Sequence, residues 1–356
     1  MERIETRIER IRSYMREQRL DAFLVSKPEN VRYLSGFTGG ADAWLLVSAD
    51  ENYILTDGRY LEQVGRECSH WELVRVERAR LDSLAAICDK YNSLGAESAH
   101  LSYDMFQQIA VRLSLQITAQ SGLIESFRMI KEDNELLLLQ EAARIGDRVF
   151  CLVCEEIRPG QSERQVANRI AYLLKEEGCS QESFPTIAVA GENAALPHGQ
   201  PGERLLQAGD MLTLDFGGFY QGYAGDMTRT VVIGQASPDL QDVYAILLEV
   251  QKMGLSAVRA GVSGRQVDAV VRDALEEHGL AQYFQHGTGH GVGLEIHEYP
   301  TLSRWYDHRL EANMVVTVEP GIYIPGWGGI RIEDTVIVLE GGCEVITHSP
   351  KDLLII

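Results

Sequence analysis

The stretch Arg259–Gly279, RAGVSGRQVDAVVRDALEEHG, repeats the earlier stretch Arg158–Gly178, RPGQSERQVANRIAYLLKEEG. At an offset of 101 residues, nine of 21 positions are identical. In both copies a glycine turn and a serine that can cap a helix precede a helical segment. Further on, Leu206–Gly217 (LQAGDMLTLDFG) matches Leu310–Gly321 (LEANMVVTVEPG) at an offset of 104. The C-terminal part of the chain is therefore predicted to contain two halves built from one helix–strand unit.

The part of the chain before this repeat alternates short apolar runs with amphipathic segments. Such alternation is typical of an α/β domain with a mixed or parallel sheet. Strands are expected at Asp21–Ser26, Ala43–Ser48 and Asn52–Asp57, and a helix over Leu81–Leu94.

Length and composition indicate an ordinary globular protein of two domains. The chain has 356 residues, of which 45% are apolar and 24% charged, and domains average roughly 150 residues. A boundary is expected near Gly122–Asp133, before a long helix from about Glu132 to Ile157. The predicted domains are residues 1–125 and 126–356.

The acidic balance argues against two classes of partner. With 33 Lys plus Arg against 52 Asp plus Glu, the net charge is −19, whereas nucleic acid and anionic membranes attract basic surfaces. Summed over the sequence, residues 1–125 carry −4 and residues 126–356 carry −15. We therefore expect no nucleic-acid partner and no membrane partner.

The N-terminus and the cysteines point to a reducing compartment. No run of about 18 apolar residues exists, and the charged N-terminus lacks a signal-peptide core. Six scattered cysteines predict reduced thiols and a cytoplasmic location. Cys151 and Cys154 form a C-x-x-C within the predicted long helix, which we interpret as two buried helix cysteines rather than a metal or redox site.

Acidic residues occur at matched places in the predicted strands. In MLTLDF, Asp215 shares a face with Thr213, and in DMTRTVVI, Asp226 shares a face with Thr228 and Thr230. Antiparallel pairing of these strands would bring the two aspartates together.

The second half repeats this pattern, with Glu319 in the predicted strand Met314–Ile324 and Glu333 in Ile330–Leu339. Four converging carboxylates would repel one another and have raised pKa values, which two divalent cations would prevent. Any one of these acids alone would be read as a solvated strand residue. Four at matched positions of a repeat favour a metal site.

A histidine would supply the fifth ligand. The glycine-rich segment QHGTGHGVGLEIHE places His286, His290 and His297 close together, and His198 in LPHG is a further candidate. Such an oxygen-rich ligand set suits Mn²⁺ and related ions better than a thiolate zinc site. Two metals about 3.5–4 Å apart can activate a shared water, which indicates hydrolytic chemistry.

These segments resemble the motifs of one enzyme superfamily. LDFG…GDMTRT, HGTGHGVGLEIHE, VEPGIY and RIEDT are similar to the successive motifs of the aminopeptidase P, prolidase and methionine aminopeptidase metallopeptidases, peptidase family M24. KPENVRYLSGFTG and LTDGRY resemble the creatinase-like N-terminal domain of the Xaa-Pro branch, which methionine aminopeptidases usually lack. The resemblance implies an α/β creatinase-like N-terminal domain followed by an α+β pita-bread catalytic domain with an internal pseudo-two-fold repeat.

The resemblance also implies roles for individual residues. Asp215 would chelate one metal, Asp226 and Glu333 would bridge both, and His290 and Glu319 would bind the second, with Glu319 also acting as the proton shuttle. His297 and His198 would flank the bond being cut and hold the substrate carbonyl, His286 would lie by the proline-side pocket, and Tyr323 and Arg331 would support substrate binding.

The implied enzyme is an exopeptidase with two divalent metal ions per chain, Mn²⁺ first, with Co²⁺ or Zn²⁺ as alternatives. It would act on peptides with proline at the second position and form a homodimer. Our main interpretation is an Xaa-Pro aminopeptidase, and the alternative is an Xaa-Pro dipeptidase, which needs a group that pairs with the free carboxylate. A catalytically inactive pita-bread binding protein is the remaining class, but all five ligands are present in this sequence.

Overall fold

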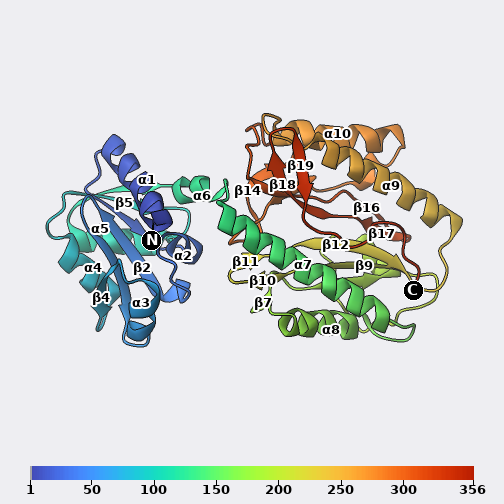
Figure 1. Ribbon diagram of the computed structural model, residues 1–356, viewed down its shortest axis with the longest axis horizontal. Coiled ribbons are helices and arrows are strands. Elements are labelled where there is room, and N and C mark those ends of the chain that lie inside the picture. Colours follow the sequence, from blue (N-terminus) through green and yellow to red (C-terminus); the bar gives the residue numbers. More distant parts are fainter. Residues whose placement is uncertain (1) are drawn as a thin grey trace. The chain divides into compact units, whose positions relative to one another are not determined.

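The computed structural model describes residues 2–356 and divides into two compact units. The N-terminal unit ends at Arg128, and the C-terminal unit runs from Met129 to Ile356 (Figure 1). The sequence places its domain boundary between residues 125 and 126, inside helix α6 (Leu123–Arg128), and that assignment stays a prediction. Within residues 2–356, no helix has the length and apolar character needed to span a membrane.

The strands of the N-terminal unit are β1 (Ala22–Val25), β2 (Ala43–Ser48), β3 (Asn52–Asp57), β4 (Glu72–Val76), β5 (Ser93–Glu97) and β6 (Gln116–Gln120). They form one sheet in the order β4-β3-β2-β1-β5-β6. Strand β1 pairs antiparallel with β2 and parallel with β5, so the mixed sheet expected from the alternating pattern is confirmed.

The helices of this unit are α1 (Glu2–Gln18), α2 (Pro28–Ser35), α3 (Leu61–Glu67), α4 (Arg80–Cys88), α5 (Tyr103–Leu113) and α6, with a short 3-10 turn η1 (Gly40–Asp42). The expected helix over Leu81–Leu94 is wrong in its second part. After α4 the amides of Asn92 and Ser93 donate to Asp21 at 2.8 and 3.0 Å, and Leu94 is buried in β5. The acceptor on a distant segment redirects the chain into the sheet.

The C-terminal unit holds four long helices and thirteen strands. The helices are α7 (Asp133–Glu156), α8 (Glu163–Glu176), α9 (Pro238–Ala257) and α10 (Gly264–Glu277), with 3-10 turns η2 (Gly191–Ala195) and η3 (Ala281–Tyr283). The strands are β7 (Gln181–Glu182), β8 (Ile187–Ala190), β9 (Met211–Phe216), β10 (Gly218–Tyr220), β11 (Tyr223–Ala224), β12 (Met227–Val232), β13 (Gly289–Gly291), β14 (Glu298–Leu302), β15 (Val315–Val318), β16 (Gly321–Ile324), β17 (Gly328–Arg331), β18 (Asp334–Leu339) and β19 (Gly342–Val345).

The internal repeat is visible at the start of helices α8 and α10. Ser162 and Ser263 each accept from the backbone amide of the glutamine three residues on, at 3.2 Å. Gln165 and Gln266 in turn accept from the serine amides at 2.8 and 2.9 Å. Both helices therefore begin with the same capping box, as the matched sequences predict.

The predicted antiparallel strand pair of the first half is confirmed. Strands β9 and β12 are neighbours in the sheet β12-β9-β8, with Asp215 opposite Thr228. Leu212, Leu214 and Phe216 point into a core formed with α7 and α8, because alternate residues of a strand face opposite sides. Thr213 and Asp215 therefore face the other side of this sheet.

The two long strands expected in the second half are each broken. Strand β15 ends at Val318 and pairs with β18, whereas β16 begins at Gly321 and pairs with β17 in a separate two-stranded sheet. Pro320 lacks the amide hydrogen needed to continue the first ladder. Glu319 lies in one break and Glu333, between β17 and β18, lies in the other.

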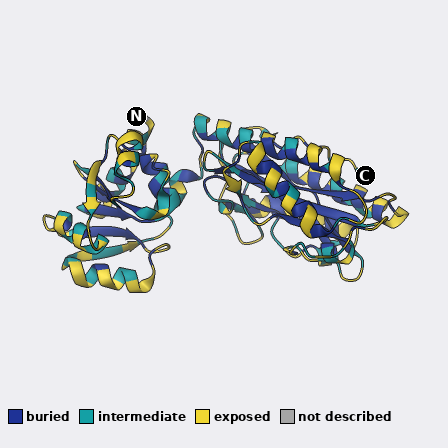
Figure 2. Cartoon of the chain, turned by 90° about the horizontal axis from the view of Figure 1, so that it is seen from below, coloured by how far each residue is buried: buried dark blue, intermediate teal, exposed yellow. Residues whose placement is uncertain are grey.

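Burial follows the same logic in both units. Figure 2 shows that most strands are buried and that the helices keep one exposed side, whereas the edge strands β4 and β6 of the N-terminal sheet are only partly buried. All six cysteines are free, as predicted, and Cys151 and Cys154 lie in α7. The expectation that both are buried is wrong, because Cys151 is exposed, whereas Cys154 is half-buried and packs against the core of this unit.

Candidate active site

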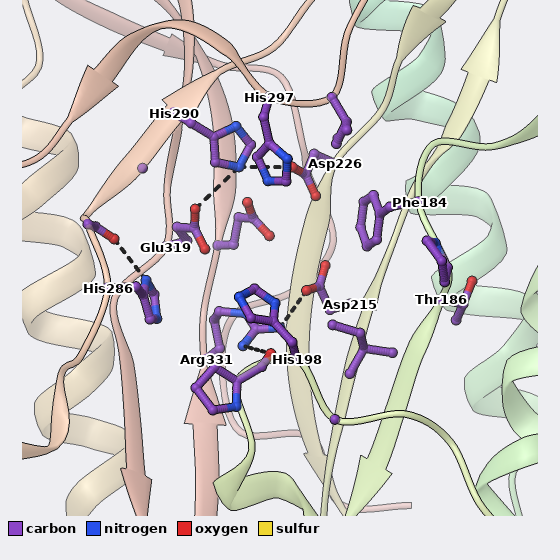
Figure 3. A pocket seen from close by; sticks show the side chains of 18 of the residues that line it. Phe184, Thr186, His198, Asp215, Asp226, His286, His290, His297, Glu319 and Arg331 are labelled. Atoms are coloured by element: carbon purple, nitrogen blue, oxygen red, sulfur yellow. Dashed lines mark hydrogen bonds and ion pairs between the residues drawn. The ribbon is translucent and has the colours of Figure 1, made fainter.

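A cavity of about 560 Å³ gathers nearly all of the predicted site residues. Its walls include four carboxylates, four imidazoles and a guanidinium: Asp215, Asp226, Glu319, Glu333, His198, His286, His290, His297 and Arg331. Figure 3 labels all of these side chains except Glu333 and shows them around a common space, with Phe184 on the side opposite His286. Tyr323 is buried behind the wall rather than in it.

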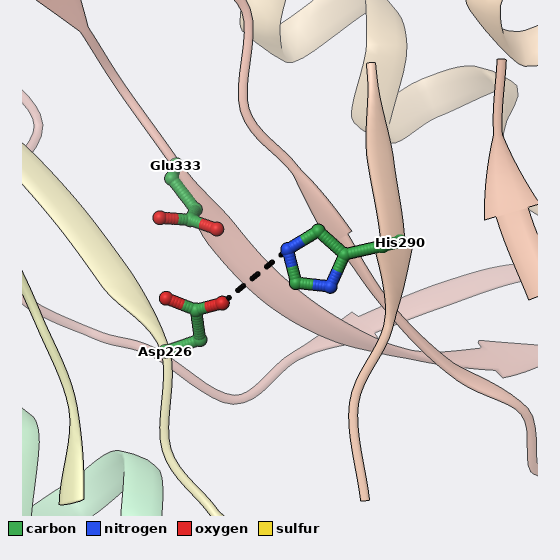
Figure 4. Close-up of side chains that lie close together, drawn as sticks. All are labelled: Asp226, His290 and Glu333. Atoms are coloured by element: carbon green, nitrogen blue, oxygen red, sulfur yellow. Dashed lines mark ion pairs between the residues drawn. The ribbon is translucent and has the colours of Figure 1, made fainter. Parts of the chain in front are cut away.

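The tightest cluster in this cavity is formed by Asp226, His290 and Glu333. One potential ligand atom from each lies within 4.8 Å of the other two, and Figure 4 shows the three side chains converging from separate strands and loops. Thr228 donates its hydroxyl to Glu333 Oε2 at 2.7 Å, which fixes that carboxylate. A group of this composition has the chemistry of a metal site.

His290 presents a free nitrogen to the acids. Its Nδ1 lies 3.1 Å from the carbonyl oxygen of Gly291, a contact that assigns the ring proton to Nδ1. Burial lowers the pKa of this imidazole to about 3, with a further contribution from His297, so the ring is neutral near pH 7. The unprotonated Nε2 then faces Asp226 Oδ2 at 3.5 Å and Glu319 Oε1 at 3.4 Å. Three electron-rich atoms at these distances call for a cation between them.

The buried carboxylates of the cavity also have shifted pKa values. Burial raises the pKa of Asp226 and Glu333 well above the usual carboxyl range, and the neighbouring acids raise it further. Burial also raises the pKa of Glu319 to about 8, opposed by the positive charge of Arg331. These acids cannot all be ionised at neutral pH unless further positive charge is present.

Asp215 has a different environment. Arg331 donates to its Oδ2, forming an ion pair whose members are both almost fully buried. Its other oxygen, Oδ1, is among the few buried side-chain polar atoms of the described residues that have no hydrogen-bond partner. A buried carboxylate oxygen is costly to leave unpaired, so this atom fits a ligand role. The residues present therefore fit divalent cations.

Arg331 connects the acids to the rest of the wall. Its Nε donates to the Thr228 hydroxyl at 3.1 Å, and its Nη1 donates to the Tyr323 hydroxyl at 2.6 Å and to the Pro197 carbonyl at 3.2 Å. The Tyr323 hydroxyl also lies 2.9 Å from His286 Nε2. One guanidinium thus ties Asp215, Tyr323 and the segment before His198 into a single network.

The remaining histidines surround the ligand cluster. The ring centroids of His290 and His297 are 4.2 Å apart. Burial lowers the pKa of His286 to about 4 and, less strongly, that of His297, so both imidazoles are held toward the neutral form. His198 is exposed on the cavity wall. Neutral imidazoles can donate or accept a hydrogen bond at a peptide group.

Comparison with known proteins identifies the family. The sequence pattern of metallopeptidase family M24 matches residues 138–340, and that of the creatinase/prolidase N-terminal domain matches residues 7–130. The chain belongs to metallopeptidase family M24. It is a metalloexopeptidase with the pita-bread fold, and the family implies divalent metal ions at the site described above.

Several M24 proteins align along nearly the whole chain. An Xaa-Pro dipeptidase from Bacillus anthracis has a similar structure, with a TM-score of 0.96, 41% identity, and coverage of 99% of this chain and 100% of that one. An Xaa-Pro dipeptidase from Pyrococcus furiosus is 34% identical, covering 99% and 100% of the two chains. An X-Pro aminopeptidase from Thermotoga maritima aligns with a TM-score of 0.89 and 34% identity, covering 96% and 100%.

Several residues that shape this M24 site were given no role in the prediction from sequence, although Thr228 was placed on the same strand face as Asp226. Thr228 and Thr317 donate hydroxyls to Glu333 and Glu319, the latter at 3.2 Å. Thr317 could have been found, because it matches Thr213 in the repeat. Glu163 and Asp268, both buried, had no such signal: each stands at a place where the two copies of the repeat differ.

Proposed function

We propose that this M24 enzyme is an Xaa-Pro dipeptidase that requires two divalent metal ions. The observation that carries the metal-dependent hydrolysis is the unprotonated His290 Nε2 facing two buried carboxylates in the cavity. The relatives named Xaa-Pro dipeptidases, which match from end to end at 34 and 41% identity, support the dipeptide substrate over the aminopeptidase reading.

The proposed metal ligands are Asp215, Asp226, His290, Glu319 and Glu333. Their oxygen-rich composition favours Mn²⁺, with Co²⁺ or Zn²⁺ as alternatives. When bound, such ions lower the pKa of a water molecule and polarise the substrate carbonyl.

Glu319 is the proposed proton shuttle. Its carboxylate borders the cavity and takes a proton from the attacking water at one oxygen, then passes it to the nitrogen of the leaving proline. The peptide bond breaks, the water oxygen stays on the first residue as a carboxylate, and the proline nitrogen, which receives both protons of the water, leaves as an ammonium group. A high intrinsic proton affinity, indicated by the raised pKa of Glu319, suits this exchange.

Three histidines of the cavity wall are proposed to bind the substrate. His198 and His297 hold the carbonyl oxygen of the bond being cut, where negative charge develops. His286 lines another part of the wall and contacts the proline side, and Tyr323, buried behind it, supports that imidazole through its hydroxyl. The apolar side chains of Phe184, Ile187 and Ile296 complete the lining and exclude water.

The test compares a Xaa-Pro dipeptide with the matching Xaa-Pro-Xaa tripeptide, each with the Mn²⁺-loaded and the metal-stripped protein. We expect a higher kcat/KM for the dipeptide and loss of both activities on stripping. Full activity after stripping would remove the metal-dependent mechanism.

A second candidate is the Xaa-Pro aminopeptidase, favoured by the Thermotoga maritima structure. A tripeptide cleaved better than the dipeptide would establish it in place of the dipeptidase. We also propose that the chain forms a homodimer, which light scattering on the purified protein would test.

A further inference from the structure

The buried carboxylate of Glu163 holds both ends of the loop that carries His198. Glu163 is the first residue of α8 and has no exposed surface. Its Oε1 accepts from the amide of Ala190 at 2.8 Å, and its Oε2 accepts from the amide of Gly202 at 3.0 Å. These two amides bracket residues 190–202, with His198 between them.

A side chain inside the loop, that of Asn193, also binds the Glu163 carboxylate. Asn193 Nδ2 lies 3.1 Å from Oε1 and 3.2 Å from Oε2 of Glu163. The middle of the loop is tied separately, because Pro197 accepts from Arg331 at 3.2 Å. The backbone on both sides of His198 is therefore fixed, although the imidazole itself is exposed to the cavity.

The second half of the C-terminal unit also has a buried acid that holds the segment of a cavity histidine, but at another helix position. Asp268, one turn into α10, is buried and accepts from the amide and the hydroxyl of Thr288 at 3.1 and 2.9 Å. It also pairs with Arg272 at 2.7 Å, and Arg272 donates to the carbonyl of His286. In each half, a buried acid on the repeat helix holds the segment of one cavity histidine.

The repeat sequences show that the two buried acids do not occupy matched positions. In the repeat, Glu163 matches Gly264, where an added Cβ would lie 2.1 Å from the carbonyl oxygen of Thr301. No side chain fits there, so the second half places its acid four residues later, where the first half has Ala167. Each half therefore holds the segment of a cavity histidine with a buried acid, but from a different helix position. This indicates that the histidine-bearing loops, rather than the helices, require the acid.

We propose that Glu163 is a positioning residue for His198, and that Asp268 serves His286 in the same way. The proposal rests on the proposed function, in which both histidines contact the substrate. Neither acid lines the cavity, so each acts through the loop it holds. Misplacing a substrate-contacting group by about 1 Å can cost two orders of magnitude in rate.

A double-mutant cycle tests the assignment. Glu163→Gln keeps the shape but turns an amide group toward a backbone N–H, and should lower kcat/KM on a Xaa-Pro dipeptide roughly 10- to 100-fold. In a His198→Ala background the same change should lower it less than about twofold, because the histidine is already gone. In a His286→Ala background the loss should remain full. Asp268→Asn should show the reverse pairing.

Equal losses in all backgrounds, or an unchanged kcat/KM for Glu163→Gln, would overturn the proposal. Should Glu163→Gln not fold, Asn193→Ala removes only the side-chain donor and is judged by the same cycle, with a smaller loss. Asp21→Asn, which releases two backbone amides in the N-terminal unit, is the control and should show no dependence on either histidine.

A second measurement separates this inference from the proposed function. Amide hydrogen exchange over residues 190–202 should be faster in Glu163→Gln than in the unmodified protein, whatever the substrate proves to be. Unchanged protection of the Ala190 and Gly202 amides would overturn the inference. Failure of the unmodified enzyme to cleave any Xaa-Pro peptide would instead overturn the proposed function.

Discussion

Asp215 and Glu319 occupy the same position in the two halves of the C-terminal unit, but their surroundings differ. Asp215 lies within a continuous strand and is paired with the guanidinium of Arg331. Glu319 lies in a break between β15 and β16. Its carboxylate accepts a hydroxyl hydrogen bond from Thr317 at 3.2 Å and lies 3.4 Å from His290 Nε2. The difference teaches that a duplicated acid can be held in a buried ion pair in one copy and left without a cationic side chain of the described residues against it in the other, where we propose that it exchanges a proton.

The local backbone explains how the two copies diverged. Phe216 follows Asp215 and continues the ladder opposite Met227. Pro320 follows Glu319 and cannot continue the ladder, so the chain leaves the sheet and enters the β16–β17 pair. The break places Glu319 beside His290 rather than in a regular strand.

The largest expected effect comes from exchanging these two carboxylates for amides. Glu319→Gln should lower kcat roughly 10²- to 10⁴-fold at saturating Mn²⁺, because the amide cannot carry the proton. Asp215→Asn should act mainly through weaker metal binding and recover part of its activity as Mn²⁺ is raised. Kinetics over a metal titration distinguish the two. A normal kcat for Glu319→Gln would contradict the proposal that Glu319 carries the proton whereas Asp215 only binds metal.

Arg331→Lys should have the next largest effect. A lysine cannot donate at once to Asp215, Tyr323 and Thr228, since it lacks the planar fork of arginine. We expect kcat/KM to fall roughly 10- to 100-fold, as for other residues that support metal ligands. Arg169→Lys, on the exposed Arg169–Glu156 pair of α8 and α7, is the matched control and should stay within about twofold. Equal values for the two variants would contradict the special role of the Asp215 pair.

The pH dependence of the metal-stripped protein tests the other side of the comparison. Burial raises the pKa of Glu319 from 4.5 to about 8, and those of Asp226 and Glu333 also rise. An acid whose pKa is raised on folding stabilises the folded state below its ordinary pKa. This stabilisation is lost as the pH rises toward the pKa of the acid in the folded state. At pH 6.5 the unfolded-state imidazoles of His286, His290 and His297 are still about half protonated, so their lowered folded-state pKa values oppose this fall by at most about 0.4 kcal/mol each. This opposition fades by pH 8 and is smaller than the effect expected from three buried acids.

The Tm of the stripped protein should therefore fall from pH 6.5 to pH 8, whereas that of the Mn²⁺-loaded protein should not. Calorimetry with and without Mn²⁺ measures both. Glu319→Gln should reduce the fall in the stripped form, since it removes one of the buried acids. A Tm that rises over this interval without metal would show that the acids are compensated in another way.

The sequence was sufficient to predict what periodicity and duplication determine. The capping boxes at Ser162 and Ser263 and the pairing of β9 with β12 follow from local pattern and alternation. Alternation also predicted that Asp215 and Asp226 share a face with threonines. The family resemblance added the individual ligand roles, which remain proposals.

Features that depend on contacts distant in sequence were not predictable. The amides that end the expected helix after Cys88 bind Asp21, about 70 residues away, and no local signal marks that partner. Likewise, Glu163 reads as an ordinary first-turn acid of α8, and only folding brings Ala190 and Gly202 to it. Long-range hydrogen bonds of this kind account for these two failures, whereas the break of the strand expected over Met314–Ile324 has a local cause, Pro320.

The smallest expected effect comes from the threonines that match in the repeat. Thr317 donates to Glu319 Oε1 at 3.2 Å and accepts from the His290 amide at 3.1 Å. Thr213 instead lies 3.2 Å from the Thr230 hydroxyl and donates to the Gly329 carbonyl at 3.2 Å, away from any proposed proton carrier.

Thr317→Val removes a hydrogen bond that lowers the pKa of Glu319, so the acid limb of kcat/KM should move to higher pH with a few-fold loss of rate. Thr213→Val should lower Tm but leave that limb in place. If both variants shifted the limb equally, the matched carboxylates would not differ in proton exchange, and the asymmetry between the two halves would have no catalytic meaning.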